Sequence, residues 1–205
     1  MYEALGRESV HPFPARMAPG IALRVVGEKE KPLRILDPMM GSGTVLALAQ
    51  ANGHKTIGID IDPLAVLISK VWTRTINREK ALLEAAEVLR RAQRKAASLT
   101  VKNSFPKGAD DETRNFITYW FDPVVRKQLT ALAWAINDVK SERVRDVLWC
   151  AISRLIIVKK VGVSLAMDLS HSRPHKVFDK ALIKPFDKFL SSVDRVVGNL
   201  SLIHI

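Results

Sequence analysis

Two acidic positions frame a glycine turn in the segment ILDPMMGSGTVLALAQANGHKTIGIDIDP, residues 35–63. A short apolar run ends in Asp37, the sequence Gly-Ser-Gly-Thr follows at residues 41–44, and a second apolar run ends at Asp60. Glycine lacks a Cβ, so a ligand can lie close to the backbone of such a turn. The segment therefore predicts a binding site for a ligand that is compatible with a carboxylate on each side of the turn.

Phosphate-bearing ligands fit this turn poorly. A phosphate-binding P-loop has Gly-Lys-Ser/Thr after its turn, whereas Thr44-Val45-Leu46 follow here. The dinucleotide fingerprint Gly-x-Gly-x-x-Gly needs a third glycine where Leu46 stands. In addition, Asp37 would repel a pyrophosphate in a cleft of low dielectric constant. The residues disfavour both classes of nucleotide site.

S-adenosylmethionine suits the same residues because it carries an ammonium and a sulfonium group and no phosphate. Asp37 would attract the cationic methionyl part, and the glycine turn would lie beside it. A second acid at the end of the second strand, roughly 20 residues beyond the turn, would accept hydrogen bonds from both ribose hydroxyls. Asp60 follows Gly43 by 17 residues, and Ile61 could form an apolar wall for the adenine. The alternative is a glycine turn that merely joins a strand to a helix.

Asp62 has a different predicted role. It directly precedes Pro63, and an acid followed by proline at the first helical position is typical of a helix N-cap. We therefore assign the ribose contact to Asp60 and the helix cap to Asp62.

The periodicity of apolar residues predicts how the site is positioned. Strands at 33–37 and 55–60 alternate with helices at 44–53 and from 63 onward, and a helix covers much of 14–27. This order is the beginning of an open parallel sheet. After about residue 75 only helix and loop patterns follow. The predicted helices there span 77–99, 123–139, 142–159 and 184–200, with a polar loop at 103–115 and a basic, turn-rich connection at 164–180.

Composition limits the class of protein and its partners. The chain has 205 residues, 47% apolar and 26% charged, which is typical of a globular protein with one sizeable core. A net charge of +11 favours polyanionic partners, although a solubility surface is the alternative. The single cysteine, Cys150, excludes an internal disulfide and is expected to be buried and inert. No apolar run reaches roughly 18 residues and no signal core begins the chain, so we expect a cytoplasmic protein without a membrane segment.

Together these residues resemble the N4-cytosine/N6-adenine DNA methyltransferases. Residues 37–44, DPMMGSGT, look like the family's "DPF-GSGT" cofactor motif, and residues 58–63, GIDIDP, look like its "GxExxP" motif. Residues 11–17, HPFPARM, are similar to the "HPxPAK" element, with arginine for lysine at Arg16. The resemblance implies a Rossmann-like methyltransferase fold of the α/β class, here with an incomplete sheet and a large helical insertion.

The resemblance also implies a function. These enzymes transfer a methyl group from S-adenosylmethionine to an exocyclic amino group of cytosine or adenine in DNA, often within restriction-modification systems. The alternatives are an RNA guanine-N2 methyltransferase and a non-catalytic nucleic-acid-binding module with a methyltransferase-like shell. The expected cofactor-binding residues are Asp37, Pro38, Gly41, Ser42, Gly43, Thr44, Asp60 and Ile61, together with Phe13 and Arg16 of the preceding element.

The motif with which the family grips its target base is absent from the sequence. That motif is Asp/Asn/Ser-Pro-Pro-Tyr/Phe/Trp, and no Pro-Pro pair occurs in this chain. The nearest string, Asp122-Pro123-Val124-Val125, is explained as a helix cap. We therefore assign no catalytic residue and expect an N-terminal fragment that is inactive alone. Residues 1–75 would begin the cofactor domain, 76–200 would form the insertion and recognise DNA, and 201–205 would be a non-native end.

Other candidate sites are weaker. Several basic residues could contact phosphates, although a solvated helix face explains the first five as well. They are Arg90, Arg91, Arg94, Lys95, Lys102, Arg173, Lys176 and Lys180. His171 and His175 flank Pro174 and lack a third ligand, so we expect no metal site. Trp120, Trp134 and Trp149 lie on apolar helical stripes and are expected in the core.

Overall fold

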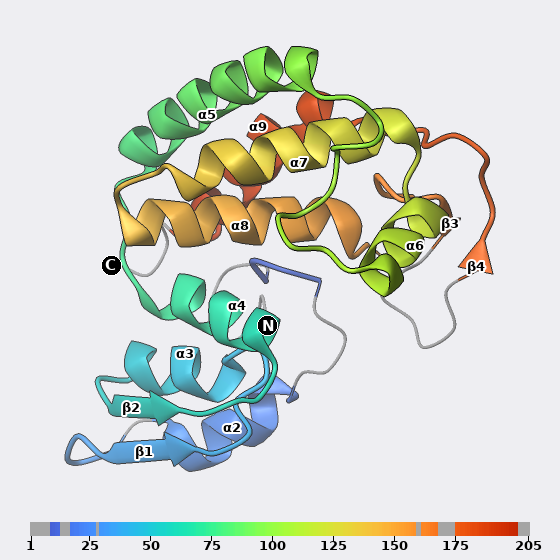
Figure 1. The fold of residues 1–205 in the computed structure, drawn as a ribbon. Coiled ribbons are helices and arrows are strands. Elements are labelled where there is room, and N and C mark those ends of the chain that lie inside the picture. Colours follow the sequence, from blue (N-terminus) through green and yellow to red (C-terminus); the bar gives the residue numbers. More distant parts are fainter. Residues whose placement is uncertain (1–8, 13–16, 28, 159–160, 168–174, 201–205) are drawn as a thin grey trace.

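The computed structural model describes residues 9–12, 17–27, 29–158, 161–167 and 175–200. Over these residues the chain is a mixed α/β structure that is mostly helical and has little sheet. Figure 1 shows two strands with helices α2, α3 and α4 on one side of the molecule, and a larger group of helices above them.

The two predicted strands are present and lie side by side. Strand β1 (Arg34–Asp37) and strand β2 (Lys55–Gly58) pair in parallel, with Leu36 opposite Ile57. Helix α3 (Thr44–Ala51) connects them, as the sequence predicts. Helix α2 (Pro19–Val26) packs on α3 in a small apolar cluster that includes Ile35 of β1. Both helices therefore cover the same face of the sheet.

Helix α4 (Pro63–Thr73) joins this α/β part to the remaining helices. It begins at Asp62, whose carboxylate accepts a hydrogen bond of 2.8 Å from the Leu64 N–H, so the predicted N-cap is confirmed. On its other side Ile68, Val71 and Trp72 are buried in the main core. One apolar core thus runs from α4 into the helical part without interruption.

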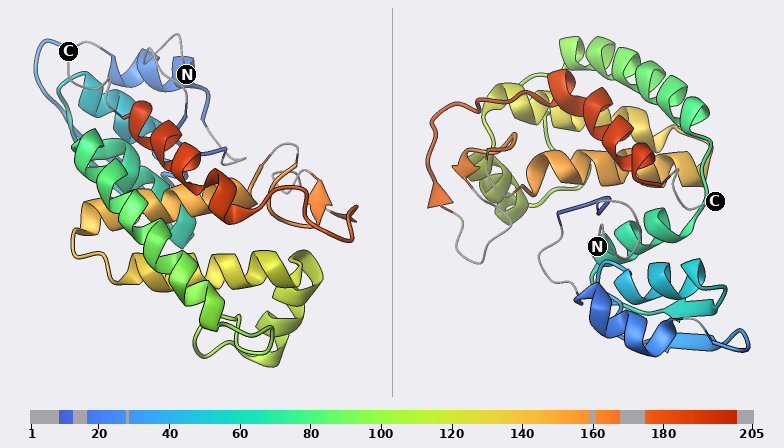
Figure 2. Two further views of the ribbon diagram at one scale, coloured as in Figure 1. Left: turned by 90° about the horizontal axis from the view of Figure 1, so that it is seen from above. Right: turned by 180° about the vertical axis from the view of Figure 1, so that it is seen from behind.

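The helical part is built from five helices and a short strand pair within the residues described (Figure 1). These elements are α5 (Arg78–Ser98), α6 (Asp111–Trp120), α7 (Pro123–Asn137), α8 (Glu142–Ile156), α9 (Pro185–Gly198), β3 (Ala166–Met167) and β4 (His175–Lys176). Figure 2 shows α5, α7, α8 and α9 stacked on one another, and their facing apolar side chains form the main core.

The structure adds an element to each of two segments that were predicted without one. The polar loop predicted at 103–115 gives way to α6 from Asp111, because Asp110 caps that helix by accepting from the Thr113 N–H at 2.8 Å. The connection predicted at 164–180 contains the antiparallel pair β3–β4. The charged residues at the start of α6 are typical of a loop by composition alone. Acidic residues such as Asp111 and Glu112 also stabilise a helix N-terminus, which is the role they have here.

The aromatic and cysteine predictions have mixed outcomes. Trp134 is 44% exposed, so its expected place in the core is wrong, while Trp120 and Trp149 are partly buried. The fully buried tryptophan is Trp72 of α4. Cys150 is buried as expected, and burial raises the pKa of its thiol to about 12, which suppresses the reactive thiolate.

Asp122 does more than cap a helix. One carboxylate oxygen accepts from the Val125 N–H at 2.9 Å and caps α7. The other accepts from the Ala181 N–H at 2.8 Å and from the Lys184 ammonium at 3.1 Å. This single buried side chain therefore ties the start of α7 to the segment before α9. Over the residues described, no helix combines the length and apolarity needed to cross a membrane.

Candidate functional site

The carboxyl ends of β1 and β2 are joined by backbone hydrogen bonds around the glycine turn. The Ile59 N–H donates to the Asp37 carbonyl at 2.9 Å, and the Met40 N–H donates to the Ile59 carbonyl at 3.0 Å. The turn then closes with the Gly43 N–H on the Met40 carbonyl at 2.9 Å. Because the strands are parallel, Asp37 and Asp60 emerge at the same edge of the sheet.

Asp60 is held in place by the turn that it faces. One oxygen accepts from the Gly41 N–H at 2.8 Å, and the other accepts from the Asp62 N–H at 2.9 Å. These backbone hydrogen bonds lower the pKa of Asp60 below its ordinary value, and the one from Asp62 has the larger effect. The side chain is therefore a fixed, ionised acceptor. A carboxylate offers about four lone-pair positions, so its oxygens retain capacity for a further donor.

The two glycines of the turn adopt positive φ, at +50° for Gly41 and +80° for Gly43. A Cβ on Gly43 would lie 2.5 Å from Ser69 Oγ and 2.9 Å from Ser69 Cβ. The sequence reasoning attributed the glycines to the approach of a ligand. At Gly43 the structure supplies another cause, which is the close packing of α4 on the turn.

Exposure separates the predicted site residues into two groups. Ser42, Gly43 and Thr44 are buried, whereas Asp37, Gly41 and Asp60 are partly exposed and Pro38 is exposed. Ile61 is fully exposed beside them. A ligand that reaches this edge from solvent therefore meets Asp37, Pro38, Gly41, Asp60 and Ile61 before it meets the buried residues of the turn.

Asp37 is less constrained than Asp60. One of its carboxylate oxygens accepts from the Met39 N–H at 3.2 Å, and the side chain lies at the rim of the turn. Asp37 and Asp60 thus place two acceptors at one edge of the sheet, an arrangement suited to a ligand with a cationic group and hydroxyl donors. Among the residues that the structure describes, no group of three metal-ligating side chains gathers. His175 is exposed, and His171 lies outside the described residues.

The element before the turn is only partly described. Phe13 and Arg16, both expected to bind the cofactor, lie outside the described residues. His11 is fully buried, and its Nε2 lies 3.0 Å from Ser153 Oγ of α8. The neighbouring Val10 carbonyl accepts from Arg154 at 2.7 Å. Val10 and His11 are therefore anchored on α8 of the helical part.

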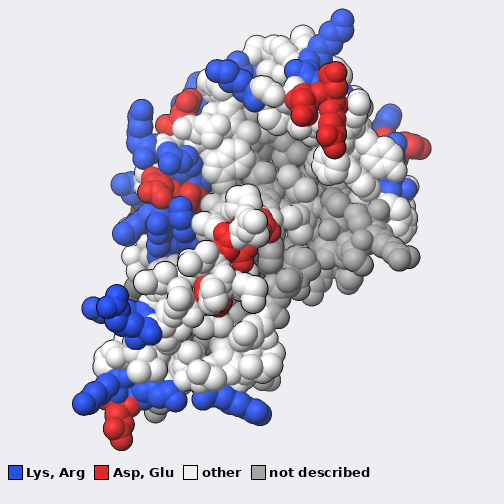
Figure 3. All heavy atoms as spheres, turned by 60° about the horizontal axis from the view of Figure 1, so that its bottom comes forward, with Lys and Arg blue, Asp and Glu red and all other residues white. Residues whose placement is uncertain are grey.

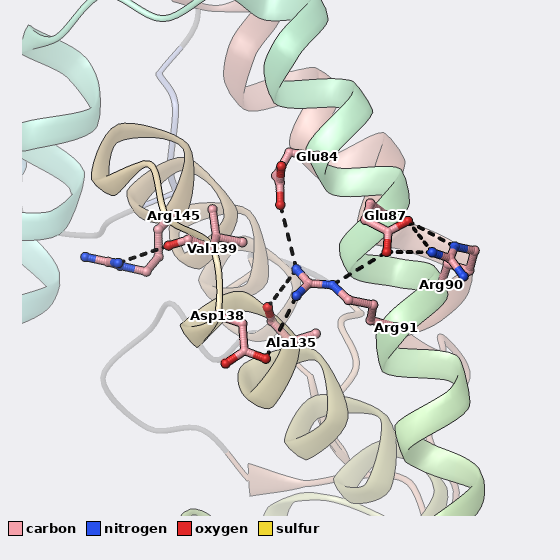
Figure 4. A network of polar contacts seen from close by, with 8 residues as sticks. All are labelled: Glu84, Glu87, Arg90, Arg91, Ala135, Asp138, Val139 and Arg145. Atoms are coloured by element: carbon pink, nitrogen blue, oxygen red, sulfur yellow. Dashed lines mark hydrogen bonds and ion pairs between the residues drawn. The ribbon is translucent and has the colours of Figure 1, made fainter.

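Basic residues of α5 are largely engaged within the protein (Figure 4). Arg91 donates to the Ala135 carbonyl of α7 at 3.2 Å, and its guanidinium lies within 4 Å of three carboxylates, those of Glu84, Glu87 and Asp138. Arg90 pairs with Glu87 at 2.7 Å. These two arginines tie α5 to its own acids and to α7, which makes them poor phosphate ligands.

The other proposed phosphate ligands differ from Arg90 and Arg91. Lys95 lies over the ring of Trp134, 5.2 Å from its centroid. Arg94, Lys102, Lys176 and Lys180 are exposed, and Arg173 lies outside the residues described. The exposed members remain available to solvent and to an anion.

Sequence reasoning missed Ser69, which shapes the turn from α4. It lies among the buried apolar residues of that helix, which are Ala65, Ile68, Val71 and Trp72, and is 3% exposed. A small polar residue within an otherwise apolar buried stripe is the signal that identifies such a close contact, because a larger side chain would not fit against the turn.

Comparison with known proteins gives one similarity to report. Over 150 residues the chain is 29% identical to a methyltransferase, and the match covers 71% of this chain and 33% of that protein. The relative is the type II methyltransferase M.MvaI of Kocuria varians. The chain thus spans about a third of the length of the curated relative it matches. No protein-family model matches the chain, and no solved structure matches it. The similarity relates the chain to methyltransferases.

Proposed function

We propose that the chain binds S-adenosylmethionine and supplies the cofactor-binding part of a DNA amino-methyltransferase. Two findings support the proposal: the similarity to a methyltransferase and the geometry of the glycine turn. The observation that carries it is Asp60, whose carboxylate is fixed by the Gly41 and Asp62 N–H groups and keeps acceptor capacity at an open edge.

Each site residue has a role in this proposal. Asp60 accepts from the ribose hydroxyls, and Asp37 attracts the ammonium of the methionyl part. Ile61, which is fully exposed, covers one side of the adenine. The backbone of residues 41–44 lies beside the methionyl chain. Pro38 borders the turn, and Phe13 and Arg16 complete the site by family resemblance. When bound, the cofactor supplies an electrophilic methyl group on its sulfonium.

The reaction would be a direct transfer. An exocyclic amino nitrogen of cytosine or adenine attacks the methyl carbon, the bond from carbon to sulfur breaks, and the amine loses a proton. The site residues named above bind and orient the cofactor, and we assign none of them to bind the target base. The part beginning near residue 76 is proposed to contact DNA, with exposed Arg94, Lys102, Lys176 and Lys180 as phosphate ligands.

The test is calorimetric titration with S-adenosylmethionine, with NAD and ATP as phosphate-bearing comparators. We expect binding of S-adenosylmethionine alone, since Asp37 repels phosphates at this edge. Because the base-gripping motif is absent from the sequence, we expect this chain alone to transfer no labelled methyl groups to duplex DNA, and robust transfer would contradict that expectation. Methylation of RNA but not DNA would favour the guanine-N2 alternative. DNA binding without any cofactor binding would favour a non-catalytic module.

A further inference from the structure

Among the residues described, Arg126 of α7 is the one lysine or arginine that is buried, and it is 6% exposed. Its Nη1 donates to Thr118 Oγ1 of α6 at 2.7 Å, whereas its Nε is buried without a hydrogen-bond partner. Thr118 is exposed, so the guanidinium lies just beneath the surface. Burial of a charge is costly unless the charge is paired, and a buried unpartnered group often marks the place of an ion or a functional contact.

A second arginine lies against the same aromatic ring as Arg126. The guanidinium carbon of Arg126 is 5.1 Å from the centroid of the Phe105 ring, and that of Arg114 is 5.0 Å from it. Phe105 belongs to the loop between α5 and α6, and Arg114 of α6 holds this loop by donating from Nε to the Ala109 carbonyl at 2.9 Å. Two cations from different helices thus share one ring, which attracts both. We call Arg114 and Arg126 the arginine pair.

The arginine pair has no carboxylate within 4 Å among the described residues. An aspartate stands four residues before each arginine, and both aspartates are engaged elsewhere. Asp110 caps α6, while Asp122 caps α7 and binds Lys184. On the face drawn in Figure 3, acidic side chains lie beside several of the basic ones, which is the kind of neighbour that the pair lacks. The two positive charges are therefore not offset by the described residues.

We propose that the arginine pair binds a backbone phosphate when the helical part contacts DNA. Thr118 occupies Nη1 of Arg126, and no described residue accepts from its Nη2, which is left for the anion. A tetrahedral phosphate has enough acceptor oxygens for two guanidiniums, whereas a planar carboxylate matches the fork of one. Phe105 holds both cations in place before the anion arrives. Because phosphate contacts fix register and carry no base information, the pair positions the helical part on the strand without reading its sequence.

Two other roles for the arginine pair lead to different outcomes. If the pair only fastens the loop and α6 to α7, loss of an arginine changes stability and leaves the affinity for DNA unaltered. If an acidic side chain from elsewhere occupies the pair, DNA binding is again independent of it. The net charge of +11 favours the polyanion. The inference rests on the DNA contact of the proposed function, and it does not depend on whether the glycine turn binds S-adenosylmethionine.

The experiment measures binding of a fluorescein-labelled DNA duplex of mixed sequence, about 20 base pairs or two helical turns long. Fluorescence anisotropy compares the unmodified chain with R126M, R126K and R114M over a range of salt concentrations. The slope of log K against log salt reports how many phosphates the protein contacts. Arg143→Met is the matched control, because Arg143 is exposed on α8 and has no ion pair among the described residues. Circular dichroism verifies that each variant is folded.

We expect R126M and R114M each to weaken DNA binding at least about fivefold and to reduce the salt slope by about 0.9, the value for one phosphate contact. R126K keeps the charge, so it should keep the slope and lose less affinity than R126M. Arg143→Met should change neither quantity.

Unchanged affinity and slope in folded R126M and R114M would overturn the proposal, while the other DNA contacts would stand. R114M, at the less buried arginine, decides the matter if R126M does not fold. An unmodified chain that binds no DNA would overturn this proposal together with the DNA contact of the proposed function. Titration with S-adenosylmethionine tests the cofactor site separately.

Discussion

Replacement of Gly43 by alanine tests why glycine occupies this position. Its φ of +80° is disfavoured for an L-residue by about 1–2 kcal/mol. The new Cβ would also lie 2.5 Å from Ser69 Oγ and 2.9 Å from Ser69 Cβ. Such an overlap in a packed region costs about 1–3 kcal/mol more. We therefore expect Gly43→Ala to lower the free energy of unfolding by about 2–5 kcal/mol.

Gly53 provides a matched control. Its φ is +78°, and a Cβ there would meet nothing within 4 Å. Gly53→Ala therefore carries only the conformational cost, about 1–2 kcal/mol. The difference between the two alanine variants isolates the contact with Ser69.

The overlap between a Cβ at position 43 and Ser69 can also be removed by changing Ser69. Ser69→Gly removes both overlapping atoms at a cost of about 1 kcal/mol for glycine in a helix. Combined with Gly43→Ala, it should recover the steric part, which gives a coupling free energy of about 1–3 kcal/mol. Urea unfolding, followed by the fluorescence of tryptophans that include buried Trp72, measures the unmodified protein and the four variants. Equal losses for Gly43→Ala and Gly53→Ala, with no coupling to Ser69, would refute the packing explanation.

The remaining predictions concern Asp122, Arg91 and Asp60. Asp122→Ala should reduce stability by about 2–4 kcal/mol in urea unfolding. Burial alone would raise the pKa of Asp122, but hydrogen bonds from Val125, Ala181 and Lys184 outweigh it and lower the pKa below 3.8. The stabilisation that Asp122 contributes should therefore be complete above pH 3.8 and be lost as pH falls through its lower pKa in the folded protein. A urea midpoint near neutral pH that is the same for Asp122→Ala and the unmodified protein would contradict this. Arg91→Met should lower the free energy of unfolding by about 1–2 kcal/mol, because Arg91 donates a hydrogen bond to α7. Arg94→Met, its control, should change the free energy of unfolding by no more than about 0.5 kcal/mol. Similar losses in the two variants would show that the contacts of Arg91 do not stabilise the fold. Because backbone hydrogen bonds lower the pKa of Asp60, cofactor affinity should stay flat between about pH 7 and pH 5 in calorimetric titrations, and a loss centred near pH 6 would be inconsistent with it.

Local sequence signals predicted the α/β part well. Strand ends, the glycine turn and the Asp62 cap are encoded within a few residues, so periodicity and cap chemistry predict them. The structure reproduces the strands at β1 and β2 and the helix between them. The grouping of Asp37 and Asp60 at one edge follows from the parallel pairing of these strands.

Contacts between distant segments were beyond the reach of local signals. Ser69 packs on Gly43, Asp122 binds Ala181 and Lys184, and Arg91 binds the carbonyl of Ala135. Each contact joins segments that are distant in the sequence, and the sequence around either partner carries no sign of the other. Trp134 shows the same limit: its helical stripe is apolar, yet its position on α7 is 44% exposed.

The central claim is that Asp60 and the glycine turn bind S-adenosylmethionine, and isothermal titration of the Asp60→Asn variant tests it most directly. Asp179→Asn, the same chemical change at an exposed residue, is the control. We expect Asp60→Asn to weaken binding at least about tenfold through loss of charge-assisted hydrogen bonds, and Asp179→Asn to leave it unchanged. Equal affinity in the two variants, with both folded, would contradict the assignment of the cofactor site.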